Sequence, residues 1–144
     1  AAEAIISFIY SAGSRDITII NRTINNAKKI AKRYKGIKFT NTIKKEDFVE
    51  AGLVINTTSL GMIGYPNLDV DLKGINKKAI IYDIVYNPIE TNLIIKAQKQ
   101  GLEYITGIDM FVEQAIRSFE IWFNITPEID KNLLDSLKKK INKK

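Results

Sequence analysis

Residues 79–105 have the sequence AIIYDIVYNPIETNLIIKAQKQGLEYI, and this stretch sets the fold that we expect for the chain. Its first six residues form an apolar run that is typical of a buried strand. A helix is expected from Thr91 to Gln100, ended by Gly101, and a second short strand from Glu103 to Ile105. A strand, a helix and a strand in succession favour a parallel sheet.

The same alternation continues on both sides of this stretch. Apolar strands are expected at 17–20, 38–40 and 53–56, a long loop at 57–72, and helices at 1–10, 25–34, 46–50, 107–122 and 127–141. The predicted fold class is therefore α/β, with a Rossmann-like, doubly wound parallel sheet. Because the chain opens inside a helix, we expect the first strand and its glycine-rich turn to lie upstream of Ala1. One domain, residues 1–144, is then truncated at its first strand.

Length and composition limit the chemistry. A chain of 144 residues with 45% hydrophobic content can form one domain with a core. No apolar run approaches the roughly 20 residues that cross a bilayer, and no leader is recognisable, so we expect a soluble, cytoplasmic protein without a membrane partner. The absence of cysteine and histidine excludes thiolate nucleophiles and removes the commonest general base and metal ligand. No metal site is expected.

The net charge of +6 suits an anionic ligand, but much of the excess lies in the terminal segment 138–144. Lysines near a helix C-terminus interact favourably with the helix dipole, which explains this cluster without nucleic acid. No nucleic-acid recognition motif accompanies the charge, so no nucleic-acid partner is expected.

Polar or glycine-bearing segments follow four of the expected strands. Ligands of such sheets bind beyond the carboxyl ends of the strands, so these segments are the candidate site. They are Asn21-Arg22-Thr23, Asn56-Thr57-Thr58-Ser59-Leu60-Gly61-Met62, Asp83-Ile84-Val85-Tyr86-Asn87-Pro88 and Thr106-Gly107.

The first of these segments indicates the cofactor. In dinucleotide folds an acidic residue at this place accepts a hydrogen bond from the 2′-hydroxyl of NAD. This chain has Asn21 and Arg22 instead, and a guanidinium can pair with a 2′-phosphate, so NADP is favoured over NAD. The alternatives are an ordinary surface arginine for Arg22 and a helix N-cap for Thr23.

The helix expected at 107–122 carries a further signal. Met110, Ala115, Phe119 and Trp122 recur at roughly helical spacing and can face a sheet. Gly107 precedes the helix where backbone can approach a ligand closely, and the amide of Gln114 can reach a polyhydroxylated ligand. The alternative is a packing helix with one satisfied polar residue.

Taken together, the four segments and the stretch Gly107-Ile-Asp-Met-Phe-Val-Glu-Gln-Ala115 with Ser118-Phe-Glu-Ile-Trp122 resemble the cofactor-binding half of shikimate dehydrogenases, in the family's order and over nearly the whole chain. The resemblance implies reduction of 3-dehydroshikimate by NADPH to shikimate, a step toward aromatic amino acids. It also implies an N-terminal substrate domain as the partner of this NADP domain. A homodimer is a further alternative.

The resemblance also implies roles for individual residues. Cofactor contacts are implied for Ala1, Asn21, Arg22, Thr23, Asn26, Thr57, Ser59, Ile84 and Gly107, and substrate contacts for Tyr86 and Gln114. Asn26 stands where many relatives carry a second basic residue, so the grip on the 2′-phosphate rests mainly on Arg22, with Lys28 or Lys29 as helpers. The family's catalytic lysine and aspartate belong to the other half, so this chain has no catalytic residue and is expected to be inactive alone.

Three alternatives stay open at this point. The chain could be a non-catalytic nucleotide-binding or regulatory module, although Tyr86 and Gln114 argue against that. It could belong to a quinate and shikimate dehydrogenase that uses NAD. A basic anion binder would depend on residues 138–144 instead of Arg22.

Overall fold

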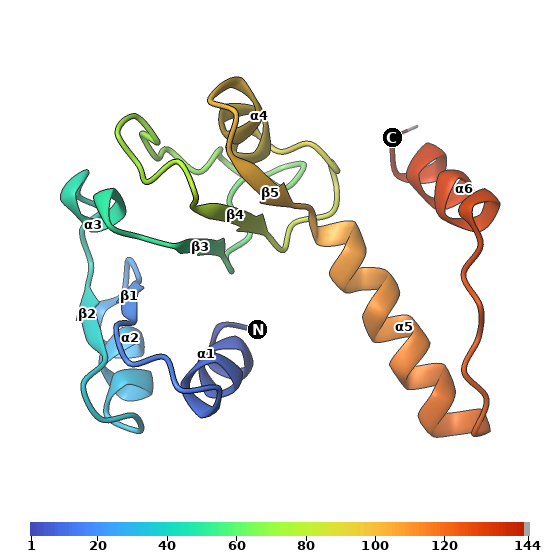
Figure 1. Cartoon of the computed structure of the whole chain (residues 1–144), viewed down its shortest axis with the longest axis horizontal. Coiled ribbons are helices and arrows are strands. Elements are labelled where there is room, and N and C mark those ends of the chain that lie inside the picture. The colour runs from blue at the N-terminus through green and yellow to red at the C-terminus, as the bar shows by residue number, and fades with distance from the viewer. Residues whose placement is uncertain (143–144) are drawn as a thin grey trace. The chain divides into compact units, whose positions relative to one another are not determined.

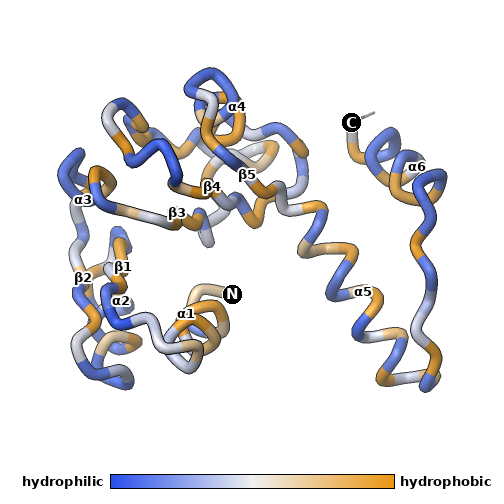
Figure 2. Tube along the Cα trace, viewed as in Figure 1, coloured by the Kyte–Doolittle hydropathy of each residue, from blue (hydrophilic) through white to orange (hydrophobic). Residues whose placement is uncertain are grey.

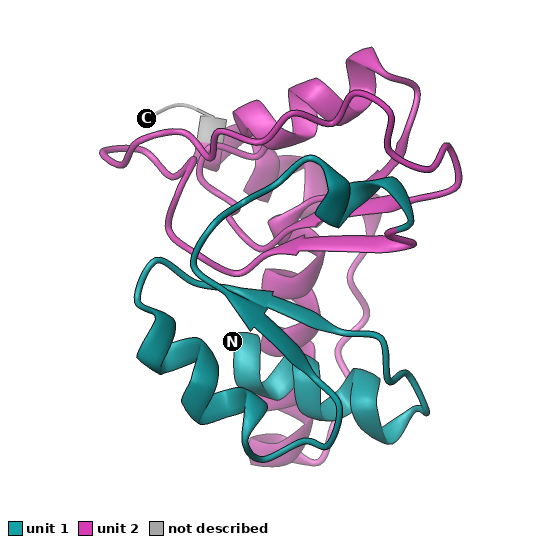
Figure 3. Ribbon diagram, turned by 90° about the vertical axis from the view of Figure 1, so that its left-hand side faces the viewer, with its two compact units in different colours: residues 1–50 teal, residues 51–144 magenta. Residues whose placement is uncertain are grey.

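The computed structural model describes residues 1–142, in which short parallel strands alternate with helices (Figure 1). The chain divides into two compact units, residues 1–50 and residues 51–144 (Figure 3). Each unit contains its own parallel sheet. The units are therefore described one after the other.

Unit 1 is a small β-α-β structure with one helix before it and one after it. Its elements are α1 (Ala2–Ser11), β1 (Thr18–Ile20), α2 (Ile24–Ala31), β2 (Lys38–Thr40) and α3 (Glu46–Val49). β1 and β2 pair in parallel. Ile19 of β1 is buried with Ala27 and Ala31 of α2 and Ile6 of α1. Ala27 and Ala31 are four residues apart, so both lie on the face of α2 that packs on the sheet.

Unit 2 contains a three-stranded parallel sheet in the order β3-β4-β5. Its elements are β3 (Leu53–Asn56), β4 (Ile80–Asp83), α4 (Asn92–Lys99), β5 (Glu103–Ile105), α5 (Gly107–Phe123) and α6 (Lys131–Asn142). The register places Asn56 opposite Asp83 and Tyr82 opposite Ile105. The carboxyl ends of all three strands thus meet at one edge of the sheet.

The predicted strand, helix and strand of residues 79–105 are confirmed, and local chemistry explains their limits. The side chain of Thr91 accepts a hydrogen bond from the Ile94 amide at 3.3 Å and caps α4. Leu93, Ile94 and Ala97 are buried. Gly101 has a φ of +66°, a left-handed conformation that ends the helix and leads into β5.

The Rossmann-like α/β class is confirmed, but the strands form two sheets and not one continuous sheet. Within each unit the strand order, β1-β2 and β3-β4-β5, agrees with the order on one flank of a doubly wound sheet, where consecutive parallel strands are neighbours.

The last helix begins later than predicted. A helix was expected at 127–141, but α6 begins at Lys131. The carboxylate of Asp130 accepts a hydrogen bond from the Leu133 amide at 2.7 Å and so caps the first turn of α6. Residues 143 and 144 of the basic terminal segment lie outside the described residues.

The buried face of α5 also differs from the prediction. Ala115 and Trp122 are exposed, Trp122 by 74%, whereas Ile108 and Val112 are buried. Apolar residues occur on more than one side of this helix (Figure 2), so helical spacing alone selected the wrong stripe. The residues that pack against the Ile89, Ile108 and Val112 cluster are Ile116, Ile129, Leu134, Leu137 and Ile141.

The apolar stripe of the last helix, formed by Ile129, Leu133, Leu134, Leu137 and Ile141, is partly exposed. The chain turns back after α5 (Figure 1), and every residue of this stripe except Leu133 packs against the Ile89, Ile108 and Val112 cluster. Leu133 is exposed, at 45%. None of the helices within residues 1–142 has the length and apolar character that crossing a membrane requires.

Candidate functional site

A cavity of about 310 Å³ opens where β3 and β4 end. The segments that follow these two strands form its walls, with Thr58, Ser59, Met62, Ile84, Val85, Tyr86 and Asn87 as lining residues. Three residues predicted from the sequence, Ser59, Ile84 and Tyr86, are thereby brought together. Thr57 is not among the lining residues, and its neighbour Thr58 takes that place.

The phenol ring of Tyr86 is held by an aromatic neighbour. The ring lies on Phe111 of α5, with 4.9 Å between ring centroids and 29° between ring planes. Tyr86 keeps 40% of its surface exposed, so its hydroxyl can serve a ligand. Gln114, three residues after Phe111 on α5, is exposed and is not among the residues that line the cavity.

Gly107 is required by the protein's own backbone. A Cβ atom at this position would lie 2.3 Å from the carbonyl oxygen of Ile84 and 2.5 Å from that of Val85. The sequence pattern suggested that Gly107 allows a ligand to approach, and the structure shows that it allows α5 to start against the segment after β4. The cavity wall and α5 are thus joined at one tight contact.

A buried carboxylate lies behind the cavity. Asp83, with no exposed surface, accepts hydrogen bonds from the Asn56 amide nitrogen (2.9 Å), the Val85 backbone amide (3.0 Å) and the Thr91 hydroxyl (2.6 Å). Burial raises the pKa of this carboxyl above its ordinary value of 3.8, and the hydrogen bonds from Thr91, Val85 and Asn56 oppose that change in part. All three partners donate, as the ionised form requires.

The predicted cofactor residues of unit 1 lie in the turn between β1 and α2. The side-chain oxygen of Asn21 accepts a hydrogen bond from the Thr23 amide at 2.8 Å, which shapes the turn. Thr23 is at the N-cap of α2, but its side chain makes no capping hydrogen bond. Arg22 and Asn26 are exposed, and Arg22 forms no ion pair within residues 1–142.

Ala1, the remaining predicted cofactor residue, is exposed at the N-cap of α1. Its carbonyl accepts a hydrogen bond from the Ile5 amide at 3.1 Å. Unit 1 therefore offers one free guanidinium in a turn next to the N-terminus of α2, whereas the cavity belongs to unit 2.

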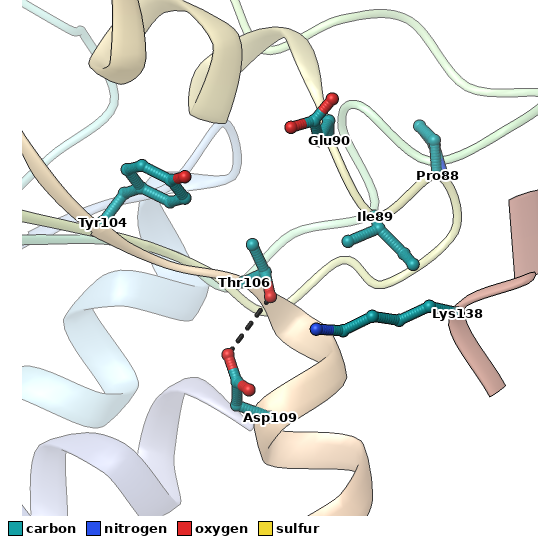
Figure 4. A pocket seen from close by; sticks show the side chains of 7 residues that line it. All are labelled: Pro88, Ile89, Glu90, Tyr104, Thr106, Asp109 and Lys138. Carbon is teal, nitrogen blue, oxygen red and sulfur yellow. Dashed lines mark hydrogen bonds between the residues drawn. The ribbon is translucent and has the colours of Figure 1, made fainter. Parts of the chain in front are cut away.

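A second, larger cavity of about 770 Å³ lies near the ends of β5 and α6 (Figure 4). Its lining residues are Pro88, Ile89, Glu90, Tyr104, Thr106, Asp109 and Lys138, of which Pro88 and Thr106 belong to the candidate segments that were predicted from the sequence. The Thr106 hydroxyl donates to Asp109 at 3.1 Å, and Gln98 donates to Glu90 and Tyr104 at 3.0 and 3.2 Å. The Glu90, Tyr104, Thr106 and Asp109 side chains thus have hydrogen-bond partners within the protein. The smaller cavity, which gathers Ser59, Ile84 and Tyr86, is the better candidate site.

The acidic side chain of Asp109 affects one neighbouring group. Burial, and after it the negative charge of Asp109, raises the pKa of Tyr82 above its ordinary value of 10.0. Among residues 1–142, no group of three or more acidic side chains is arranged to hold a metal ion.

Comparison with known proteins agrees with this architecture. The family model for the shikimate 5′-dehydrogenase C-terminal domain matches residues 107–131. A shikimate dehydrogenase (NADP(+)) from Chelativorans sp. (strain BNC1) is 38% identical over 135 residues, which cover 92% of this chain and 48% of the relative. The chain spans about half the length of the curated relatives it matches.

Solved structures share this fold. A quinate dehydrogenase from Corynebacterium glutamicum in complex with NAD matches 99% of this chain and 51% of its own, with a TM-score of 0.79 and 21% identity. A shikimate dehydrogenase in complex with NADP+ matches 89% of this chain and 46% of its own, with a TM-score of 0.67 and 28% identity.

The fold and the strand-end cavity thus define an α/β domain of the Rossmann-like class. Within that class the chain belongs to the shikimate dehydrogenase family and matches the C-terminal half of its members.

Proposed function

We propose that this chain is the cofactor-binding half of an NADP-dependent shikimate dehydrogenase, which reduces 3-dehydroshikimate to shikimate with NADPH. The cavity at the ends of β3 and β4 supports this proposal most directly, because it gathers Ser59, Ile84 and Tyr86 at the place where parallel α/β sheets bind ligands. The curated relatives carry the same activity in their names. The product is an intermediate on the route to aromatic amino acids, and a cytoplasmic location is part of the proposal.

The residues of the cavity fit a nicotinamide nucleotide. Met62, Ile84 and Val85 offer apolar surface for a flat ring, and Thr58, Ser59 and Tyr86 offer hydroxyl groups around it. Bound NADPH supplies the hydride; the protein supplies position and electrostatics. The Tyr86 hydroxyl, steadied by Phe111, and the Gln114 amide are proposed as hydrogen-bonding contacts to the substrate's hydroxyl groups.

Unit 1 contributes the proposed contact to the adenosine 2′-phosphate. Arg22 is exposed, has no ion-pair partner within residues 1–142 and is therefore free to bind an anion. Asn21, Thr23 and Asn26 complete this proposed clamp, and Ala1, Thr57 and Gly107 complete the proposed cofactor contacts. We also propose that both units are parts of one NADP-binding domain.

The catalytic lysine and aspartate are proposed to come from the N-terminal half of the full protein, which is the proposed partner of this chain. The 144-residue chain should then have no measurable dehydrogenase activity with shikimate and NADP. Turnover by the purified chain would contradict this division of labour. A homodimer of the full enzyme is a subsidiary proposal that light scattering tests.

An NMR titration tests the binding proposal. NADPH is added to the ¹⁵N-labelled chain, and the expected result is a shift of the amide signals of Arg22 in unit 1 and Tyr86 in unit 2. NADH should shift the signals near Tyr86 and leave those near Arg22 largely unchanged, because it lacks the 2′-phosphate.

The same titration separates the alternatives. Shifts confined to Lys138, Lys139 and Lys140 would indicate a basic anion binder, and equal affinities for NADPH and NADH would indicate a dual-cofactor enzyme. Shikimate added after NADP should shift the signals of Tyr86 and Gln114, and a regulatory nucleotide module would not respond to it. Quinate in place of shikimate tests the substrate range.

A further inference from the structure

The buried polar side chains of the described residues form one connected network. Asn56, Asp83 and Thr91 are the buried polar residues of unit 2, with 3%, 0% and 1% of their surface exposed. They come from the end of β3, the end of β4 and the cap of α4, and Asp83 is 27 residues from Asn56 and 8 from Thr91. Asp83 lies at the centre and accepts from both of the others.

The network reaches the cavity on two sides. The side-chain oxygen of Asn56 accepts from the Thr58 amide at 3.0 Å and from the Thr58 hydroxyl at 2.8 Å. The side-chain nitrogen of Asn56 donates to the Leu60 carbonyl at 3.0 Å. Asp83 holds the Val85 amide, one residue before Tyr86. Thr58, Val85 and Tyr86 all line the cavity.

The fold alone does not require polar groups at these positions. β3 and β4 already pair through their backbones up to Asn56 and Asp83. Burying a carboxylate has a desolvation cost, and apolar residues of similar volume stabilise a core at least as well. A fully satisfied polar network, however, fixes the geometry of the segments that it joins more strictly than apolar packing does.

We propose that Asn56, Asp83 and Thr91 are positioning residues of the nucleotide site, which hold Thr58 and Tyr86 in the arrangement that contacts the ligand. This role rests on the proposed function and extends it to residues that touch no ligand themselves. The network orders the cavity walls before binding, so less ordering accompanies ligand binding and the affinity is higher.

Thr91 offers a matched pair of variants. Thr91→Val keeps the shape of the side chain and removes the hydroxyl that donates to Asp83 and caps α4. Thr91→Ser keeps that hydroxyl and should restore both contacts. Asp83→Asn is a second variant that leaves the cap of α4 in place and changes one acceptor oxygen into a donor. If Thr91→Val does not fold, the NADPH affinity of Asp83→Asn tests the proposal instead.

The test is the affinity of each variant for NADPH, measured by NMR titration at a temperature where circular dichroism shows the variant to be fully folded. Thr91→Val and Asp83→Asn should bind about tenfold more weakly, and Thr91→Ser should stay within about twofold of the parent chain. Ile94→Val is the control, since it removes a methyl group from a buried apolar residue of α4 and leaves the network intact. It should lower Tm without lowering affinity.

Two results separate the possible failures. If Thr91→Val and Asp83→Asn lower Tm but bind NADPH as the parent chain does, the network is purely structural and the positioning role is wrong. If the parent chain itself shows no amide shifts with NADPH, the proposed function fails and the positioning role fails with it.

Discussion

The two proposed halves of the nucleotide site are built in opposite ways. The turn after β1 presents Arg22 to solvent, and one hydrogen bond from the Thr23 amide to Asn21 shapes it. The cavity after β3 and β4 is backed by Asp83, which is fully buried and accepts three hydrogen bonds. The first region thus presents an exposed charge, and the second is a cavity wall held by buried hydrogen bonds.

Because of this difference, substitutions in the two regions should affect ligand affinity and folding stability to different extents. An exposed guanidinium contributes little to folding, because ion pairs and hydrogen bonds at the surface compete with water. A buried, connected group contributes to both, since its removal leaves unpaired polar atoms inside the protein. Changes in the turn should therefore alter ligand affinity alone, and changes behind the cavity should alter the folded state as well.

The largest expected effect is that of Gly107→Ala. The added Cβ would meet two backbone carbonyl oxygens at 2.3 and 2.5 Å, and backbone atoms cannot move aside cheaply. We expect a loss of about 3 kcal/mol in the free energy of unfolding, measured by urea denaturation. Gly52→Ala is the matched control, because nothing lies within 4 Å of its added Cβ. Equal stability of the two variants would show that the contact between α5 and the β4 loop is not tight in solution.

Arg22→Ala should have the next largest effect, on affinity only. Loss of charge-assisted hydrogen bonds to the 2′-phosphate should weaken NADPH binding about tenfold and leave NADH binding and Tm unchanged. Arg33→Ala, which removes another exposed arginine of unit 1, controls for the change in net charge. If both variants weaken NADPH binding equally, only overall charge matters and the clamp is wrong.

A smaller effect is expected from Phe111→Ala. Removing the ring that stacks on Tyr86 removes about 1 kcal/mol of aromatic interaction and frees the phenol, so shikimate binding in the presence of NADP should weaken roughly fivefold. Phe119→Ala is the matched control, because Phe119 is on the same helix with nearly the same exposure, 39% against 38%. Identical binding by the two variants would remove the positioning role of Phe111.

The smallest effect concerns pH. The folded chain raises the pKa of Asp83 above 3.8, so between 3.8 and the raised value the folded state binds more protons than the unfolded state. The contribution of Asp83 to stability is therefore present below pH 3.8 and decreases as pH rises through the folded pKa. Asp83→Asn removes this titration. The free energy of unfolding of the parent chain, minus that of Asp83→Asn, should therefore decrease as the pH rises above 3.8, measured by urea denaturation; a difference that does not change with pH would contradict the assignment.

Much of the fold could be predicted because its signals are local. The apolar runs before Asn56 and Asp83 are strands, and glycines such as Gly101 end the helices as expected. The candidate cavity could be located in outline, since parallel strands end at the same edge and Ser59, Ile84 and Tyr86 follow two neighbouring strands.

The remaining features depend on contacts between distant residues. Helical spacing permits two apolar stripes on α5, and only packing against Ile89 and α6 selects Ile108 and Val112. The hydrogen bond between Asn56 and Asp83 joins residues 27 apart, and Thr91 was visible only as a helix start. Each of these side chains has an ordinary local role, so its buried partner could not be inferred from the sequence alone.

The contact at Gly107 fixes the first turn of α5 against the segment after β4. The helix has 17 residues and is therefore about 25 Å long, and its N-terminal end lies against the carbonyls of Ile84 and Val85. A tilt of roughly five degrees about the N-terminal end of α5 would displace its C-terminal end by about 2 Å over that length. A rearrangement of the loop beside Tyr86 that carried α5 with it as a rigid body would therefore displace most the exposed aromatic end, where Trp122 and Phe123 lie.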